Sequence, residues 1–292
     1  MHKAGFVNIV GLPNVGKSSL LNKISGERLS IISPKAQTTR ARLIAIVNEE
    51  NYQIIFSDTP GYINQPAYEL QRAMNSFVHE AFEDADVLLV LTDRFQSAED
   101  QQYLIDQANK SSKPVIVAVN KADISTPEQI SELNALWSNW IPKAKCFFIS
   151  VIENFNIKEL FAYIVTLLPE HPAFYDKEDI SDRSLRYFAS EIVREKIFLN
   201  YQKEIPYACE VVTEEYKESK AMDSIRCIIF VERESQKNII IGKQGSAIQK
   251  VGKEARIDLE KFLDKKVFLD LFVKVKPNWR ANEMDLKNFG YK

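Results

Sequence analysis

The sequence predicts an α/β protein, with a doubly wound, mostly parallel sheet followed by a smaller α+β domain. Residues 11–18 read Gly-Leu-Pro-Asn-Val-Gly-Lys-Ser and fit the pattern G-x-x-x-x-G-K-[ST] between an apolar run and a helix-compatible run. Strand-like and helix-like segments then alternate to about residue 168, which is typical of a parallel sheet with crossover helices. A second glycine loop, residues 242–245, lies among elements in a different order and predicts the second domain.

Length and composition agree with two domains in a cytoplasmic protein. The 292 residues exceed a typical domain of about 100 to 200 residues, and 45% of them are hydrophobic. The longest apolar runs are far shorter than the roughly 20 residues of a membrane span, and no signal peptide is recognisable. Cys146, Cys209 and Cys227 are odd in number and widely spaced, so we expect neither disulfides nor a zinc site.

The charge is distributed unevenly between the two halves. Residues 1–170 carry 15 Lys and Arg against 19 Asp and Glu, whereas residues 171–292 carry 23 against 21. Within the second half, residues 233–276 hold 11 basic against 6 acidic side chains. This excess suits an anionic partner, although such an excess taken alone is more often a solvated face.

The first glycine loop predicts a phosphate site at a strand-to-helix turn. Residues 6–10 read as a buried strand, and residues 19–24 contain no helix breaker. The glycines allow backbone N–H groups to face phosphate oxygens, Lys17 supplies a charge for the β- and γ-phosphates, and the Ser18 hydroxyl ligates Mg²⁺. The predicted nucleotide-binding residues here are Gly11, Leu12, Pro13, Asn14, Val15, Gly16, Lys17, Ser18 and Ser19.

The following strands predict where the rest of this site lies. They are expected at residues 43–47, 52–56, 87–91, 115–119 and 146–149. A polar turn at residues 48–51 joins the first two as a hairpin, and helices follow most of the others. This pattern predicts one antiparallel edge strand on a parallel sheet, with the ligand at the carboxyl ends of the strands.

A turn and a loop supply the predicted metal and catalytic residues. After the third strand comes Asp58-Thr59-Pro60-Gly61, in which the aspartate holds Mg²⁺ through water and the Gly61 N–H meets the γ-phosphate. In isolation this is an ordinary turn sequence, but its spacing behind the glycine loop favours the functional interpretation. The long polar connection 26–42 contains Thr38 and Thr39, and we expect Thr39 to complete the Mg²⁺ shell. The predicted metal ligands are Ser18, Thr39 and Asp58, and the predicted catalytic residues are Lys17, Thr39 and Gly61.

The sequence Asn120-Lys121-Ala122-Asp123 after the fifth strand predicts guanine as the base. The Asp123 carboxylate can accept both the N1–H and N2–H donors of guanine, a donor pair that adenine lacks. Asn120 can brace the glycine loop, and the alkyl stem of Lys121 can cover one face of the base. The alternative is that Asp123 caps the helix that follows.

These motifs, in this order, resemble the translation-factor-related GTPases rather than ATPases or kinases. The last motif of that family, usually Ser-Ala-x, is here Ser150-Val151-Ile152, so a valine replaces the usual alanine. Ras-type GTPases have a water-orienting glutamine where this chain has Tyr62, and the resemblance therefore implies slow intrinsic turnover. Asn14 stands where related GTPases hold potassium against the phosphates, which makes it a candidate K⁺ ligand.

The second domain begins after a polar segment. We expect domains at residues 1–170 and 183–292, joined by a linker at residues 171–182. Ser181 or Asp182 is expected to cap a helix that ends near residue 201, followed by strands near 207–214 and 224–232. The segment from Trp279 on either extends a binding groove or packs its aromatic side chain on the domain, which is the commoner outcome.

The second glycine loop predicts an RNA-binding module. A lone G-x-x-G is normally just a turn, but here it joins two helices in the order helix, strand, strand, helix, helix, strand. That order resembles a type II KH domain, whose loop approaches phosphates while an adjoining apolar groove accepts about four unpaired bases. The predicted RNA-binding residues are Ile241, Gly242, Lys243, Gln244, Gly245 and Lys250.

A GTPase domain followed by a KH domain, across the whole chain, resembles the Era-type GTPases of bacteria. The stretches RYFASEIVREKIF, IPYACEVV, FVERESQKNIIIGKQGSAIQKVGKEAR and LFVKVKPNW carry this resemblance beyond the loop itself. It implies GTP and GDP as ligands, binding of the 3′ end of small-subunit ribosomal RNA, and a role in 30S subunit assembly. It also implies a monomer with loose, peripheral contact to the inner membrane.

Two other functions remain open from the sequence. One is a constitutive RNA-binding chaperone whose nucleotide domain is only structural. The other is a P-loop ATPase or nucleotide kinase, against which Asp123 discriminates.

Overall fold

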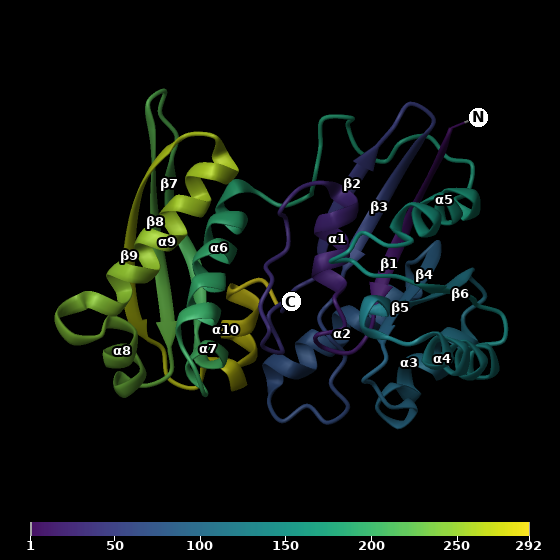
Figure 1. Cartoon of the computed structure of the whole chain (residues 1–292). Coiled ribbons are helices and arrows are strands. Elements are labelled where there is room, and N and C mark those ends of the chain that lie inside the picture. Colours follow the sequence, from purple (N-terminus) through teal and green to yellow (C-terminus); the bar gives the residue numbers. More distant parts are fainter. Residues whose placement is uncertain (1, 292) are drawn as a thin grey trace. The chain divides into compact units, whose positions relative to one another are not determined.

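The computed structural model describes residues 2–291, which form two compact units (Figure 1). The first unit contains the residues up to Ser30, Thr39–Ala67 and Gln71–Asp182. The second contains Ile31–Thr38, Tyr68–Leu70 and the residues from Arg183 on. Two short segments from the first half of the chain therefore belong to the second unit.

The first unit contains a six-stranded sheet in the order β2-β3-β1-β4-β5-β6. Only β2 is antiparallel to its neighbour β3, and the other pairs are parallel. The fold class predicted from the sequence is confirmed, including the antiparallel edge hairpin. The strands are β1 (Lys3–Val10), β2 (Leu43–Asn48), β3 (Tyr52–Asp58), β4 (Val87–Asp93), β5 (Val115–Asn120) and β6 (Lys145–Phe148).

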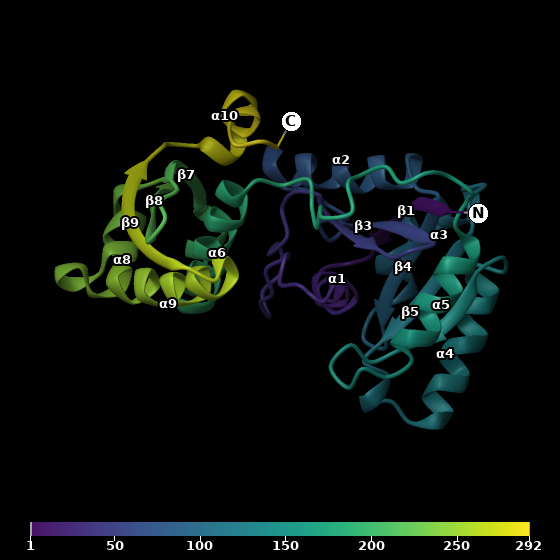
Figure 2. The same ribbon diagram turned by 90° about the horizontal axis from the view of Figure 1, so that it is seen from above.

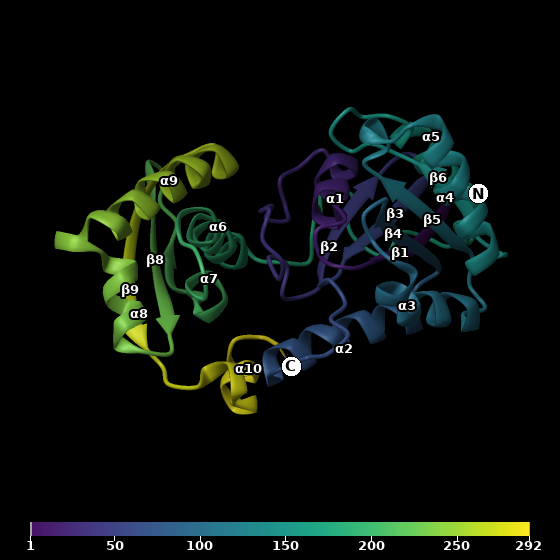
Figure 3. The same cartoon turned by 60° about the horizontal axis from the view of Figure 1, so that its bottom comes forward.

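Helices cover both faces of this sheet. Figure 3 shows α1 and α5 on one side of the strands and α2 and α3 on the other. Because both faces are covered, all residues of β4 and β5 are buried, which explains their continuous apolar runs. The helices are α1 (Lys17–Ser25), α2 (Glu69–Glu83), α3 (Ala98–Lys110), the 3₁₀ turn η1 (Ala122–Ile124), α4 (Pro127–Trp140) and α5 (Ile157–Leu167).

The segment expected as a linker is bonded along the first unit, and Figure 2 shows it as an extended trace between α5 and α6. Its backbone pairs with the edge strand, where Ile46 N donates to Ile180 O (2.9 Å). The Gln53 side chain accepts from the amides of Phe174 and Tyr175 at 2.7 and 3.0 Å. The polar composition of this segment thus reflects hydrogen bonding to the sheet edge.

The second unit contains a three-stranded sheet in the order β7-β8-β9, with β7 antiparallel and β9 parallel to β8. Buried side chains of α6, α8 and α9 pack on one face of it, among them Val193, Ile240, Val251 and Ala255. The predicted order of elements for the KH-type domain is confirmed. The elements are α6 (Leu185–Asn200), α7 (Ile205–Ala208), β7 (Glu210–Lys217), β8 (Met222–Val231), α8 (Glu234–Ile241), η2 (Lys243–Gly245), α9 (Ser246–Leu263), β9 (Lys266–Val275), η3 (Trp279–Ala281) and α10 (Glu283–Asn288).

Two local predictions in this unit were wrong, and one alternative is decided. The residue at the N-cap of α6 is Ser184 instead of Ser181 or Asp182, and its side chain makes no capping hydrogen bond. The strand expected from residue 207 begins at Glu210, because the short helix α7 occupies the preceding residues. Trp279 is fully buried and donates its indole N–H to Ala208 O (3.0 Å), so this aromatic side chain packs on the domain.

No helix within residues 2–291 has both the length and the apolar composition that a membrane span requires.

Candidate functional site

The first glycine loop connects the end of β1 to the start of α1, at the carboxyl edge of the sheet. Gly16 has φ 102°, in the left-handed region where side chains are disfavoured. At Gly11, a Cβ atom would lie 2.2 Å from the carbonyl oxygen of Leu91. The loop therefore needs glycine at Gly16 for the backbone conformation and at Gly11 for the close approach to β4. Ser19 lies in the first turn of α1, beside Lys17 and Ser18.

Lys17 is buried in this loop. Its Nζ donates to the carbonyl oxygens of Gly11 (3.1 Å) and Leu12 (2.9 Å). Burial lowers the pKa of Lys17 from 10.5 to about 8, although the nearby Asp58 carboxylate acts in the opposite direction. A buried ammonium with only carbonyl partners lacks a full counter-charge, which phosphate oxygens can supply.

Ser18, Thr39 and Asp58 bring their oxygen atoms together. Ser18 Oγ donates to Asp58 Oδ2 (2.6 Å) and lies 2.8 Å from Thr39 Oγ1, which is 3.4 Å from the same carboxylate oxygen. Ser30 also donates to Asp58 Oδ2 (2.8 Å). Burial raises the pKa of Asp58, and Lys17 and the three hydroxyl donors oppose that shift.

The other Asp58 oxygen, Oδ1, is buried and has no hydrogen-bond partner. An unpartnered carboxylate oxygen beside two hydroxyls is the all-oxygen donor set that suits a hard cation such as Mg²⁺. The three residues predicted as metal ligands are thus adjacent, and their chemistry fits the ion.

The turn after β3 lies against the glycine loop. The Thr59 hydroxyl donates to Ile9 O (2.8 Å), and Pro60 and Gly61 are buried. A Cβ atom on Gly61 would lie 2.5 Å from the backbone nitrogen of Pro13. Only glycine allows this close approach of the turn to the glycine loop.

Asn120 and Lys121 connect the predicted guanine site to the glycine loop. Asn120 donates to Val15 O (2.9 Å) and accepts from Val151 N (3.1 Å). Lys121 donates to Asn14 O at 3.2 Å. Asp123 is exposed in η1 and does not cap the next helix, because the Thr126 side chain caps α4. The helix-cap alternative for Asp123 is therefore wrong.

The segment Ser150-Val151-Ile152 lies in the same region. Ser150 and Val151 are buried, whereas Ile152 is 84% exposed. The backbone N–H of Val151 donates to Asn120 and helps to fix its orientation, and this bond does not depend on the side chain at residue 151. Asn14, the candidate K⁺ ligand, is exposed and has φ 65°, in the left-handed region.

Asp93 is a site residue that the sequence analysis missed. Its side chain is fully buried at the end of β4, and Oδ2 forms a 2.6 Å ion pair with Lys121 Nζ. Its other oxygen accepts from Phe95 N (2.9 Å). The sequence could have pointed to Asp93, because it ends a predicted parallel strand at the same edge of the sheet as Asp58 and Asn120.

The second glycine loop joins α8 to α9 through η2. Gly242 and Gly245 have φ of 71° and 79°, and a Cβ atom at Gly242 would lie 2.6 Å from the Cβ of Ala247. Lys243 and Gln244 are exposed at the tip, and Ile241 is half-buried. The loop can therefore present backbone and positive charge to a ligand at close range.

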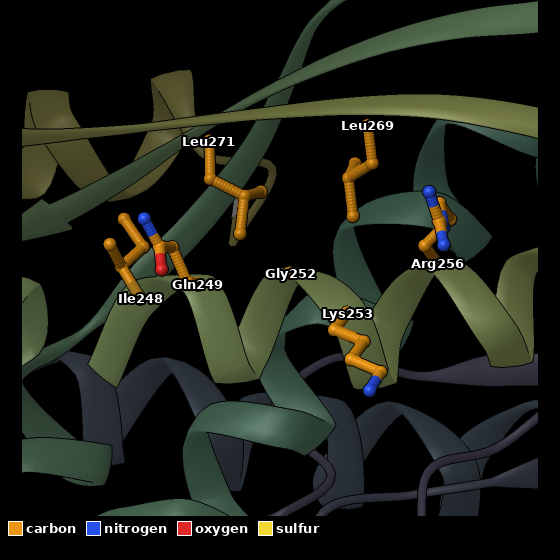
Figure 4. Close-up of a pocket in the computed structure, with 7 residues that line it drawn as sticks. All are labelled: Ile248, Gln249, Gly252, Lys253, Arg256, Leu269 and Leu271. Carbon is orange, nitrogen blue, oxygen red and sulfur yellow. The ribbon is translucent and has the colours of Figure 1, made fainter. Parts of the chain in front are cut away.

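A groove of about 340 Å³ lies beside this loop, between α9 and β9 (Figure 4). Gly252 is on its floor opposite Leu271, and Lys253 and Arg256 supply positive charge. Lys250, which was predicted to bind RNA, is not among the lining residues and lies 3.8 Å from the Glu254 carboxylate. The groove is lined by Ile248, Gln249, Gly252, Lys253, Arg256, Leu269 and Leu271.

Comparison with known proteins covers both units. A family model described as "50S ribosome-binding GTPase" matches residues 6–121, and a "KH domain" model matches residues 204–280. "GTPase Era" from Clostridium kluyveri is 40% identical over 294 aligned residues, which cover 100% of both chains. The chain belongs to the Era family of GTPases.

Other relatives are also named as Era proteins. "GTPase ERA-like, chloroplastic" from Oryza sativa subsp. japonica is 41% identical over 99% of this chain and 70% of its own length. A solved structure of Era with MgGDPNP and nucleotides 1506–1542 of 16S ribosomal RNA has a TM-score of 0.94 at 38% identity, covering 100% of this chain and 99% of that one. A tyrosine-to-alanine variant of Aquifex aeolicus Era with GDP·AlF4⁻ also has a TM-score of 0.94 at 38% identity, covering 99% of each chain.

Proposed function

We propose that this Era-family protein is a GTP-hydrolysing switch that binds the 3′ end of small-subunit ribosomal RNA and acts in 30S subunit assembly. The relative solved with MgGDPNP and 16S ribosomal RNA nucleotides supports this proposal, because its fold matches this chain over both units. The glycine loop, the Asp58 turn and the groove beside α9 supply the nucleotide and RNA sites on this chain.

GTP and GDP are the proposed nucleotides, with Mg²⁺ held by Ser18, Thr39 and Asp58. Lys17 neutralises the β- and γ-phosphates, and the Gly61 amide donates to the γ-phosphate. Thr39 is placed to join the ion, since its hydroxyl is 2.8 Å from Ser18 Oγ. Bound Mg²⁺ would neutralise charge that develops on the phosphate oxygens. Asp123 and the stem of Lys121 select and cover the guanine base.

The proposed switch rests on one observation, which is that residues Ile31–Thr38 belong to the second unit. Arg194 of α6 is fully buried and donates to Thr38 O (2.6 Å), and Glu195 accepts from Ile32 N (3.1 Å). Thr38 is bonded to α6 while Thr39, the next residue, contacts the proposed Mg²⁺ ligands. Thr38 and Thr39 are neighbours in the chain but belong to different units, and the proposed coupling runs through the peptide bond between them.

Lys35 strengthens this attachment. Its Nζ donates to the carbonyl oxygens of Phe198 and Tyr201, at the C-terminal end of α6. A cation at that end of a helix interacts favourably with the helix dipole and with carbonyls that lack a helical partner. Loss of the γ-phosphate would free Thr39, and we propose that this strains or releases the attachment of residues 31–38 to α6.

The groove is proposed to hold unpaired bases. Gly252 presents backbone without a side chain on the floor of the groove, opposite Leu271. Leu269 and Leu271 provide apolar contact, and Lys253 and Arg256 pair with phosphates. Affinity should therefore favour single-stranded over double-stranded RNA and should fall with salt.

The test compares a single-stranded RNA with the sequence of the small-subunit rRNA 3′ end with a duplex of the same sequence. Crosslinking and titration are carried out in a GTP analogue and in GDP. Nucleotide-dependent affinity for the single strand is expected; equal affinities in both nucleotides would reject the switch. Full ribosome assembly in cells that carry only Lys17→Ala would instead favour a constitutive RNA chaperone.

Four finer points are proposals of the same kind. We propose residues 171–182 as the junction of the two domains, and limited proteolysis that spares this segment while cutting elsewhere would oppose it.

A K⁺ role for Asn14 predicts faster hydrolysis in potassium than in sodium buffer. A monomer predicts a mass near 33.5 kDa by light scattering. A cytoplasmic protein with peripheral contact to the inner membrane predicts weak, salt-sensitive sedimentation with anionic vesicles.

A further inference from the structure

An aromatic cluster in the first unit contains Tyr62, the residue directly after Gly61. The Tyr62 ring stacks on Tyr103 of α3, with ring centroids 4.2 Å apart and an interplanar angle of 12°. His79 of α2 meets both rings edge-on, with centroids 6.4 Å from Tyr62 and 5.2 Å from Tyr103. The Tyr103 hydroxyl is hydrogen-bonded to His79 Nδ1. Two helices on the same side of the sheet thus supply the support for the Tyr62 ring (Figure 3).

The Tyr103 ring is itself held in place. Burial raises the pKa of Tyr103 to about 12, with a smaller contribution from Tyr62, so the phenol keeps its proton near neutral pH. Its hydroxyl is hydrogen-bonded to His79 Nδ1. Phe82 of α2 also meets the Tyr103 ring edge-on, with centroids 6.4 Å apart. Tyr103 therefore offers Tyr62 a fixed surface.

The backbone on both sides of the Tyr62 side chain is also fixed. Tyr62 N donates to Gly11 O (3.2 Å). Ile63 donates to and accepts from the Asn75 side chain, at 3.0 and 2.8 Å. The remaining freedom of Tyr62 is rotation of its side chain among three staggered positions, and the stack selects one of them.

We propose that Tyr103 is a positioning residue for GTP hydrolysis, whose ring holds the Tyr62 ring away from the path of the attacking water. In GTPases with a glutamine directly after the glycine, that side chain orients the water in line with the γ-phosphate. The position thus borders the water, and a tyrosine ring turned toward it would occupy the space that the water needs. The stack keeps this space open. The proposal rests on the GTP hydrolysis proposed above.

The experiment measures single-turnover GTP hydrolysis by the full chain with Tyr103→Ala, Tyr103→Phe and the double variant Tyr62→Ala/Tyr103→Ala. Tyr103→Ala is expected to be about two- to tenfold slower, which corresponds to about 0.4–1.4 kcal/mol and to the range of one stacked aromatic pair. Tyr103→Phe keeps the stacking face and is expected to stay within about twofold of the wild type. In the double variant no ring can block the water, so the rate should return toward the wild-type value.

GDP affinity, measured in parallel, should be unchanged in all variants, because the side chains that bond to the glycine loop are Lys17, Asn120 and Lys121. Tyr103→Leu, which fills the volume without an aromatic face, replaces Tyr103→Ala if that variant does not fold. A wild-type rate in Tyr103→Ala, or a double variant as slow as Tyr103→Ala alone, would overturn the proposal. A wild-type protein that does not hydrolyse GTP would instead overturn the proposed function.

Discussion

Nucleotide affinity should weaken as the pH rises above about 8, because Lys17 must be charged to pair with phosphates. Burial sets the pKa of Lys17 at about 8 in the free protein, and phosphate oxygens beside it must raise that pKa in the complex. A group whose pKa rises on binding takes up a proton, so affinity is complete below the free pKa and is lost above it. From about pH 7 to about pH 9 this linkage amounts to about a tenfold loss in GDP affinity.

Calorimetry in buffers of different ionisation enthalpy measures the proton directly. Binding should take up little of a proton at about pH 7 and a clearly larger fraction of one proton at about pH 8.5, since the pKa of Lys17 in the free protein is about 8. Lys17→Arg is the control, because a guanidinium stays charged over this range. Uptake near zero at about pH 8.5, or the same pH dependence in Lys17→Arg, would refute the assigned charge state of Lys17.

Three further predictions concern the base site, the coupling segment and the groove. Asp123→Asn should move the preference from GTP toward xanthosine triphosphate, measured by competition, because an amide can donate to the oxygen that replaces the guanine N2 amine. Lys35→Met should weaken binding of a GTP analogue by about tenfold or more relative to GDP, since hydrogen bonds from charged groups contribute about 1.5–3 kcal/mol. Lys253→Gln should weaken single-stranded RNA binding and reduce the salt dependence by about one phosphate contact, whereas Lys250→Gln should have a smaller effect.

Matched controls separate these effects from general loss of charge. Lys158→Met removes an exposed lysine from α5, far along the chain from residues 31–38, and should leave the GTP-to-GDP ratio unchanged. Equal weakening of GTP and GDP by Lys35→Met would argue against coupling through α6. Equal RNA affinities for the Lys250→Gln and Lys253→Gln variants would show that the groove does not direct the RNA, and retained GTP selectivity in Asp123→Asn would reject the guanine assignment.

Most of the fold was predicted correctly from local sequence patterns. The apolar runs that became β4 and β5 and the polar turn before β3 correctly predicted the doubly wound sheet with its antiparallel edge, because strand period and turn chemistry depend on neighbours in the chain. The predicted start of α6 near residue 184 and of β7 near residue 210 was wrong because these boundaries depend on more than the neighbouring residues. The start of β7 was displaced by α7, which packs by tertiary contacts, and a cap residue cannot be chosen among nearby serines without knowing where the helix begins.

The nucleotide site likewise has features that the sequence determines and features that only the tertiary structure decides. The sequence by itself determined the types of residue that meet phosphate, Mg²⁺ and guanine, since the motifs require particular atoms such as the Asp58 carboxylate or a glycine backbone. Tertiary structure alone decided which side chains support them, because Asp93, Tyr103 and Arg194 meet Lys121, Tyr62 and Thr38 across long intervals of sequence. Such contacts depend on strand order and helix packing, and those leave no local pattern in the chain. The attachment of residues 31–38 to α6 is the clearest case, since no motif in either segment predicts it.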